Sequence, residues 1–235
     1  MIFKGSIPAV ITPFDKKLNV DYDSLAKHLD FLIDNGSHGL VSCGTTGESP
    51  TLSHEEHKLV TKFIIEKSSG RVPVMAGCGS NSTKESVELT KHAYSAGASG
   101  NLLVTPYYNK PTEEGLYYHF KTIADSCPEL PTYLYNIPGR SIIKLSENLV
   151  FKLSKVKNIV GVKDATADLV TPLAISEICG SSFIQLSGED ATFLAFLVSG
   201  GQGCISVTAN VAPKLCSELY ENWVSGNIKK CMEIN

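Results

Sequence analysis

The stretch Ile159-Val160-Gly161-Val162-Lys163-Asp164-Ala165 is an apolar, β-branched run that ends in charged residues. Its apolar residues are continuous rather than alternating, which is typical of a parallel strand buried on both faces. A lysine at the end of such a strand is unusual, because burial penalises the charged ammonium. The stretch therefore predicts a central parallel strand that carries a distinctive amine at its C-terminal end.

Seven further short apolar runs occur along the chain, and segments with helical spacing separate them. The eight predicted strands are Ser6–Thr12, Gly39–Cys43, Val72–Ala76, Asn101–Thr105, Thr132–Tyr135, Ile159–Lys163, Phe183–Leu186 and Cys204–Val207. Eight strand–helix units predict a single (β/α)8 TIM barrel domain over residues 1–235. The alternative, an open doubly wound sheet, usually has a glycine-rich turn where this chain has Ile11-Thr12-Pro13-Phe14-Asp15.

The predicted helices carry start signals and apolar stripes. The start signals are Asp21 or Asp23, the capping box Ser53-x-x-Glu56, and Ser82 or Thr83 with Glu85. The stripes include Leu25-Leu29-Leu32-Ile33 and Leu59-Phe63-Ile64. We expect the eighth helix over about Ala212–Ser225 and no further packing element in Gly226–Asn235, so that the barrel is truncated after this helix.

Composition excludes several classes of protein. The net charge of −3 gives no basic field for nucleic acid, and the densest apolar run, Ala191–Val198, is far shorter than the roughly 20 residues of a membrane span. Seven cysteines without C-x-x-C spacing fit neither a disulfide framework nor a zinc site. Because Met1–Gly5 also opens without a secretory pattern, we expect a cytoplasmic location.

Polar residues gather where the predicted strands end, which is where TIM barrels place their active sites. These segments are Gly44–Ser49, Thr105–Asn109, Tyr135–Arg140, Lys163-Asp164 and Ser187–Asp190. An unperturbed lysine is neutral in only about one molecule in 2,500 at pH 7, and desolvation favours the neutral, nucleophilic amine. Lys163 is therefore a candidate nucleophile toward a ketone. The alternative is an ion pair with Asp164 or Glu189.

Other residues at these strand ends have both a functional and an ordinary interpretation. Tyr135 can shuttle protons or be a core aromatic, and the turn at Thr45 and Thr46 can hold a carboxylate or be a plain turn. Arg140 can clamp a carboxylate or make a surface salt bridge. The histidines of His54-Glu55-Glu56-His57 are three apart rather than four, so this segment is not expected to bind a metal.

Taken together, these segments resemble the dihydrodipicolinate synthase/N-acetylneuraminate lyase family of class I aldolases and lyases. The resemblance rests on Gly44-Thr45-Thr46-Gly47-Glu48, Tyr135-Asn136-Ile137-Pro138 and Gly161-Val162-Lys163-Asp164-Ala165, and it extends from Gly5 to about Ala212. The segment Thr105-Pro106-Tyr107-Tyr108-Asn109-Lys110-Pro111 and the residue Arg140 are similar to the synthase branch in particular.

The resemblance implies condensation of pyruvate with L-aspartate 4-semialdehyde on the route to diaminopimelate and lysine, without a cofactor. Lys163 would form the imine, and Tyr135 would move protons through Thr45 to Tyr108 of a neighbouring subunit in a homodimer or homotetramer. Thr46 and the backbone of Ile205 would hold the pyruvate carboxylate. Arg140 would bind the carboxylate of the second substrate.

Feedback-inhibited members of the family bind L-lysine at a dimer interface. The matching positions here are Ser49, Pro50, His54, His57, Asn81, Glu85 and Tyr107. Glu85 would suit the ammonium of an amino acid and the Asn81 amide its carboxylate.

Three departures from the family keep other functions open. Asp164 stands where family members often have glutamate, Gly139 precedes Arg140 and would loosen that loop, and family chains continue beyond the barrel with further C-terminal helices. The alternatives are another class I aldolase of the N-acetylneuraminate or 2-keto-3-deoxygluconate type, and a non-catalytic remnant of the fold. The residues Tyr107, Tyr108 and Arg140 count against a sugar-acid aldolase, which must bind a polyol.

Overall fold

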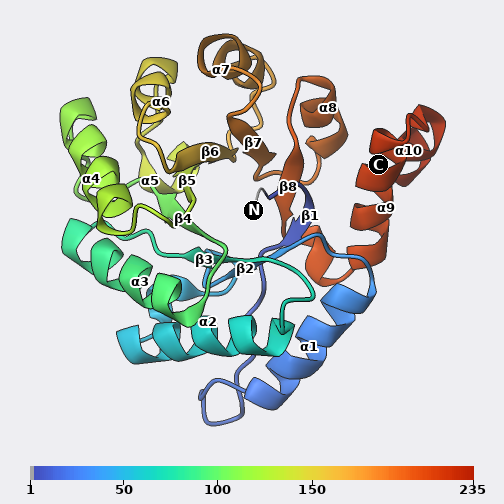
Figure 1. Cartoon of the computed structure of the whole chain (residues 1–235). Helices are drawn as coiled ribbons and strands as arrows, with labels where there is room; N and C mark the ends of the chain where they lie inside the picture. The colour runs from blue at the N-terminus through green and yellow to red at the C-terminus, as the bar shows by residue number, and fades with distance from the viewer. Residues whose placement is uncertain (1–2) are drawn as a thin grey trace.

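The computed structural model describes residues 3–235, in which eight parallel strands form one sheet with the order β1-β8-β7-β6-β5-β4-β3-β2. The strands are β1 (Gly5–Pro8), β2 (Leu40–Ser42), β3 (Val74–Gly77), β4 (Gly100–Val104), β5 (Thr132–Asn136), β6 (Ile159–Asp164), β7 (Ile184–Ser187) and β8 (Gly203–Ser206). A parallel bridge between Ala9 and Val41 joins the two edges, and the strands form the centre of the molecule inside a ring of helices (Figure 1). The predicted (β/α)8 barrel and its eight strands are confirmed.

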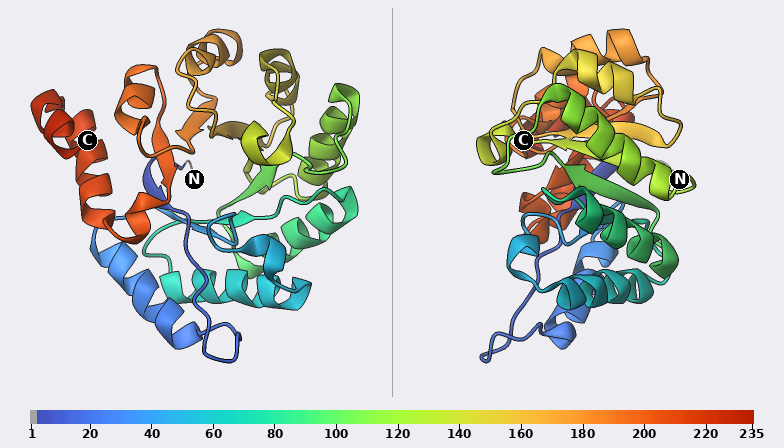
Figure 2. Two further views of the ribbon diagram at one scale, coloured as in Figure 1. Left: turned by 180° about the vertical axis from the view of Figure 1, so that it is seen from behind. Right: turned by 90° about the vertical axis from the view of Figure 1, so that its left-hand side faces the viewer.

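Eight helices surround the strands, and short helices follow β2, β5 and β8. The outer helices are α1 (Tyr22–Asp34), α2 (His54–Ser68), α3 (Thr83–Ala96), α4 (Glu113–Ser126), α6 (Glu147–Leu153), α7 (Thr171–Cys179), α8 (Phe193–Val198) and α9 (Pro213–Val224). The short ones are η1 (Ser49–Thr51), α5 (Pro138–Ser141) and η2 (Thr208–Asn210), with α10 (Ile228–Ile234) at the end of the chain. The right-hand view of Figure 2 shows η1 and α5 at the same end of the barrel.

The predicted helix starts are confirmed in their positions. Asp21 caps α1, and Ser53 and Glu56 form the complete capping box of α2. Ser82 caps α3 by accepting a hydrogen bond from the Glu85 backbone N–H, but the Glu85 carboxylate instead accepts from the Ser80 hydroxyl at 2.6 Å. Glu85 is therefore directed toward the end of β3 rather than back onto its own helix.

The predicted apolar stripe of α2 was wrong at Leu59, which is 55% exposed. The buried face of this helix instead includes His57, Val60 and Thr61. The Thr61 hydroxyl hydrogen-bonds to the thiol of Cys43 at 3.5 Å, so a polar residue is satisfied inside the protein. Helical spacing allowed two neighbouring stripes here, and the buried one packs Val60 and Ile64 against the side chains of α1 and β2.

Two hydrophobic layers hold the barrel together. One fills the interior with side chains such as Ile7, Met75 and Leu186, and the other packs the helices on the outside of the sheet. The interior is closed at its N-terminal end by Phe3, whose backbone N–H donates to the Tyr133 hydroxyl at 3.2 Å. The interior is filled below, and a cavity lies toward the C-terminal ends of the strands.

The expectation that nothing packs after the eighth helix was wrong. Helix α10 folds back on α9 (Figure 1). Cys231 is fully buried there, and its thiol donates to the Leu219 carbonyl at 3.5 Å. Gly226, with a φ of 79°, makes the turn, and Asn227 caps the new helix. Among residues 3–235, no helix combines the length and the hydropathy needed to span a bilayer.

Candidate active site

Lys163 and Tyr135 face each other inside the barrel. They occupy paired positions on β6 and β5, and the Lys163 Nζ lies 4.1 Å from the centroid of the Tyr135 ring. Alternation along β6 turns Val162 outward into the helix layer and Lys163 inward. The Lys163 residue is 7% exposed, so its amine is held in dry surroundings.

No carboxylate pairs with this lysine among residues 3–235, which argues against the ion-pair alternative. Asp164 accepts hydrogen bonds from Asn136 and Thr166, and Glu189 accepts from the backbone N–H of Ala191. Burial lowers the pKa of Lys163 to about 8, although Cys204 and Asp190 oppose the shift and Arg140 adds to it. About one molecule in ten therefore carries a neutral amine at pH 7.

The Tyr135 phenol is 5% exposed, and burial raises its pKa. Interaction with the Thr45 side chain and the charge of Arg140 both oppose this rise. The hydroxyl thus stays protonated near neutral pH, where it can give a proton to a substrate and take it back.

A cavity of about 300 Å³ opens above this pair at the C-terminal ends of the strands. Eight of the residues singled out from the sequence line it: Lys163, Tyr135, Thr45, Arg140, Ile205, Ser49, Pro50 and Tyr107. The volume suits a small metabolite. The backbone N–H groups of Thr45 and Thr46 make no hydrogen bond within residues 3–235, although that turn is otherwise hydrogen-bonded, for example from Gly47 N–H to the Gly44 carbonyl at 3.1 Å.

Two of the predicted catalytic and substrate-binding residues lie off the cavity wall. Thr46 is half-buried in the turn after β2, beside Thr45. Tyr108 is 93% exposed and has a φ of 71°, a left-handed conformation that is uncommon for an aromatic residue. Its ring is thus held away from the cavity of its own chain.

The positions matched to a lysine site cluster beside the cavity. His54 Nε2 lies 3.8 Å from Glu85 Oε1, and the Asn81 amide donates to the Tyr107 carbonyl at 3.2 Å. His57 is buried, its Nε2 has no hydrogen-bond partner among residues 3–235, and burial lowers its pKa to about 4. The amide nitrogen of Asn81 is thus already engaged within the chain.

Sequence reasoning assigned no role to several residues that shape the site. A Cβ atom at Gly188 would lie 2.8 Å from the Cε of Lys163, so the lysine side chain occupies space that only glycine leaves. Asp190 accepts from the backbone N–H groups of Val207 and Thr208 and so ties the end of β7 to the loop after β8. A glycine directly at a strand end was the one available signal for Gly188.

A buried amine of lowered pKa, facing a protonated phenol in the mouth of a (β/α)8 barrel, defines the class of imine-forming aldolases and lyases. Comparison with known proteins places the chain within that class. The sequence profile of the dihydrodipicolinate synthetase family matches residues 2–235. The chain belongs to this family, as predicted.

Three relatives illustrate the match. A 4-hydroxy-tetrahydrodipicolinate synthase of Rhizobium meliloti (strain 1021) is 55% identical over 234 residues, covering 99% of this chain and 79% of the relative. A crystal structure of the chloride-inhibited dihydrodipicolinate synthase from Acinetobacter baumannii complexed with pyruvate has a TM-score of 0.95 and 45% identity, covering 98% of this chain and 79% of that one. The enzyme from Cyanidioschyzon merolae with lysine bound has a TM-score of 0.95 and 37% identity, with coverage of 99% and 79%.

Proposed function

We propose that this protein condenses pyruvate with L-aspartate 4-semialdehyde to 4-hydroxy-tetrahydrodipicolinate, a step toward diaminopimelate and lysine. The observation that carries the proposal is the Lys163 amine, buried 4.1 Å from the centre of the Tyr135 ring at the base of a cavity. Membership of the dihydrodipicolinate synthetase family and the names of its relatives support the reaction.

In the proposed mechanism, the neutral Lys163 amine attacks the ketone carbon of pyruvate, and loss of water gives a protonated imine. The imine withdraws electrons, so the methyl group loses a proton to give an enamine. The enamine carbon then attacks the aldehyde, and attack of the second substrate's amine on the imine carbon closes the ring and frees Lys163. Tyr135 supplies and takes back the protons, with Thr45 beside it and Tyr108 of a neighbouring subunit as its outlet to solvent.

The substrate carboxylates need partners around this amine. For pyruvate we assign the backbone N–H groups at Thr45 and Thr46, which make no hydrogen bond within residues 3–235, together with the backbone of Ile205 on the cavity wall. For the second substrate we assign Arg140, an exposed cation at the rim of the cavity that can bind a carboxylate with two hydrogen bonds.

Reductive trapping tests the function. Incubation with pyruvate and borohydride should add the mass of one reduced pyruvate to the peptide that contains Lys163, and Lys163→Ala should remove the adduct. Substrate choice is tested by comparing aspartate semialdehyde with sugar aldehydes, where we expect at least about tenfold higher kcat/KM for the former. An adduct on another lysine, or the reverse ranking, would overturn the proposal.

We further propose that L-lysine inhibits the enzyme by binding beside the cavity. The cluster of Ser49, Pro50, His54, His57, Asn81, Glu85 and Tyr107 supports this site, as does the lysine-bound relative. Because Glu85 is the anionic group of the cluster, Glu85→Gln should weaken lysine inhibition by about tenfold or more and leave kcat unchanged. Glu88→Gln, on the exposed side of the same helix, is the control. Equal inhibition of both variants would contradict the site.

We also propose a cytoplasmic homo-oligomer. The exposed, left-handed Tyr108 supports assembly, because its ring has no place in the cavity of its own chain. The seven cysteines, all unpaired, support a reducing compartment.

A further inference from the structure

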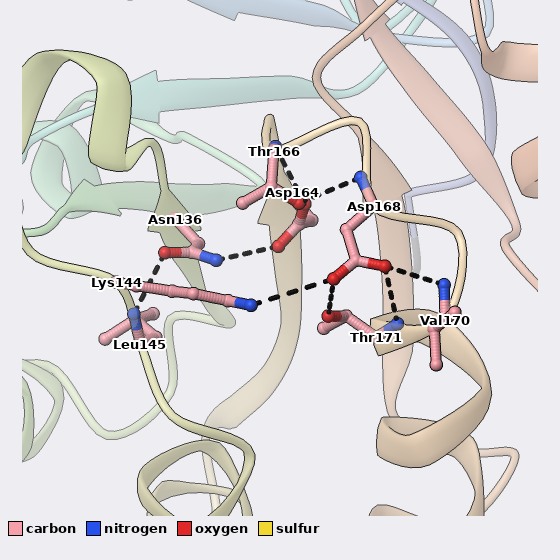
Figure 3. A network of polar contacts seen from close by, with 8 residues as sticks. All are labelled: Asn136, Lys144, Leu145, Asp164, Thr166, Asp168, Val170 and Thr171. Atoms are coloured by element: carbon pink, nitrogen blue, oxygen red, sulfur yellow. Dashed lines mark hydrogen bonds and ion pairs between the residues drawn. The ribbon is translucent and has the colours of Figure 1, made fainter.

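Asn136 and Asp164 lie one residue beyond the proposed catalytic pair on the same two strands. They are register partners on β5 and β6, as Tyr135 and Lys163 are, and alternation directs them to the opposite side of the sheet. The Asn136 Nδ2 donates to the Asp164 Oδ2 at 2.8 Å (Figure 3). The two residues are 2% and 5% exposed, so this hydrogen bond lies in the protein interior.

Each remaining oxygen of the two side chains also has a partner. The Asn136 Oδ1 accepts from the backbone N–H of Leu145 at 3.0 Å, which ties down the loop that follows Arg140. The Asp164 Oδ1 accepts from the backbone N–H of Thr166 at 2.9 Å and from its hydroxyl. Figure 3 shows that these bonds join the end of β5, the end of β6 and both following loops.

We infer that the hydrogen-bonded pair Asn136–Asp164 is a positioning device that sets how Tyr135 and Lys163 face each other and where the Arg140 loop lies. The inference rests on the proposed function, because it takes Lys163 and Tyr135 as the reacting groups. Asn136 and Asp164 do not touch the substrate cavity, so both act through their neighbours.

The physical basis is that β5 and β6 contribute one reacting group each. The two strands show a register irregularity at Thr132/Tyr133, so the backbone ladder alone does not lock them along their whole length. A side-chain bond directly after the reacting residues restrains the strand ends where the chemistry needs accuracy. A displacement of about 1 Å in such a site can cost about a hundredfold in rate.

Asp164 contributes to the pair through its hydrogen bonds and not through its charge. The charged and titratable groups that face Lys163 are Tyr135 from β5, Cys204 and Asp190 from the β7–β8 side, and Arg140 from α5. Asp164 is directed away from the cavity and is held by neutral donors. Replacing it should therefore change rates without moving the pH at which Lys163 loses its proton.

An exchange of the two side chains tests the inference. In Asn136→Asp, two carboxylates face each other, and in Asp164→Asn, one donor is left without an acceptor whichever way the new amide turns. In the double exchange, the amide at 164 donates to the carboxylate at 136. The remaining oxygens can still accept from Thr166 and Leu145, so every bond is kept and only the one between positions 136 and 164 reverses its direction.

We expect each single variant to lower kcat by about tenfold or more, with the KM for pyruvate changed by less than about threefold. The double exchange should recover kcat to within about threefold of the parent. The pH dependence of imine formation should stay unchanged in all three. Lys144→Ala is the matched control, because its exposed ion pair with Asp168, 3.7 Å long, belongs to the same network but contributes little.

Two results would overturn the inference: single variants with the parent kcat, or a folded double exchange no more active than the worse single variant. If a single variant does not fold, Thr166→Val, which removes the hydroxyl that donates to the Asp164 Oδ1 at nearly constant side-chain volume, replaces it and should lower kcat in the same direction. Failure of the proposed function is separable, because it would show as absence of the pyruvate adduct on Lys163 in the parent protein.

Discussion

The Lys163 amine and the Tyr135 ring are held 4.1 Å apart at paired positions of two neighbouring strands. Burial acts on both groups in the same sense, because it disfavours charge: the pKa of the amine falls and that of the phenol rises. The resting pair is therefore closer to a neutral amine and a neutral phenol than it would be in water. This is the state that attack on a ketone requires.

Imine formation should follow the deprotonation of Lys163. Since the pKa is about 8, the trapping rate with pyruvate and borohydride should rise about tenfold per pH unit below pH 8 and level off above it. The measurement is the initial rate of adduct formation on Lys163 between about pH 6 and pH 9.5. A rate still rising steeply beyond pH 9.5 would show that the amine has an ordinary pKa.

Lys163→Met should stabilise the protein while abolishing activity. Between about pH 8 and pH 10.5 the unfolded lysine binds a proton that the native one does not, so the parent gains stability as pH rises through this window. Below pH 8, the buried charged ammonium lowers the parent's free energy of unfolding by about 3 kcal/mol. The uncharged methionine side chain removes this penalty. Urea unfolding at pH 7 and pH 10 should show a gain that shrinks at the higher pH. The exposed Lys152→Met should show no such gain, and an equal gain there would contradict the explanation.

Gly188→Ala should impair catalysis by displacing the lysine. The new methyl group would lie 2.8 Å from the Cε of Lys163 and 2.7 Å from the Cβ of Ala165, both too close for ordinary contacts. We expect kcat/KM for pyruvate to fall by about a hundredfold. Gly139→Ala, where a Cβ atom meets nothing within 4 Å, should stay within about twofold. Similar kinetics for the two variants would mean that Lys163 does not depend on the space at Gly188.

Tyr108 should act in the site of a neighbouring subunit. Tyr108→Phe and Lys163→Ala should each be strongly impaired, and subunits of the two variants reassembled together should recover activity. About a quarter of the parent activity is expected for random dimers, because half are mixed and each mixed dimer has one complete site. No recovery in a mixture shown to contain mixed dimers would rule out action between subunits.

Much of the site could be predicted because short-range sequence patterns mark the strand ends and a barrel brings those ends together. Lys163, Tyr135 and Thr45 were identified as polar residues at the ends of apolar strands, and they do line one cavity. Leu59 and the segment after Gly226 were predicted wrongly, since each depended on packing against distant residues: the cluster around Val60 and Ile64 for α2, and the body of α9 for α10.

The sequence by itself determined the strands, the helix caps and the order in which reactive residues occur, because these depend on neighbours a few positions apart. Only the tertiary structure decided the pairing of Tyr135 with Lys163, the burial that lowers the lysine pKa, and the space at Gly188 that the lysine occupies. These properties arise from contacts between separate strands and from the exclusion of water by the closed barrel. A local stretch of sequence determines neither the contacts between strands nor the exclusion of water.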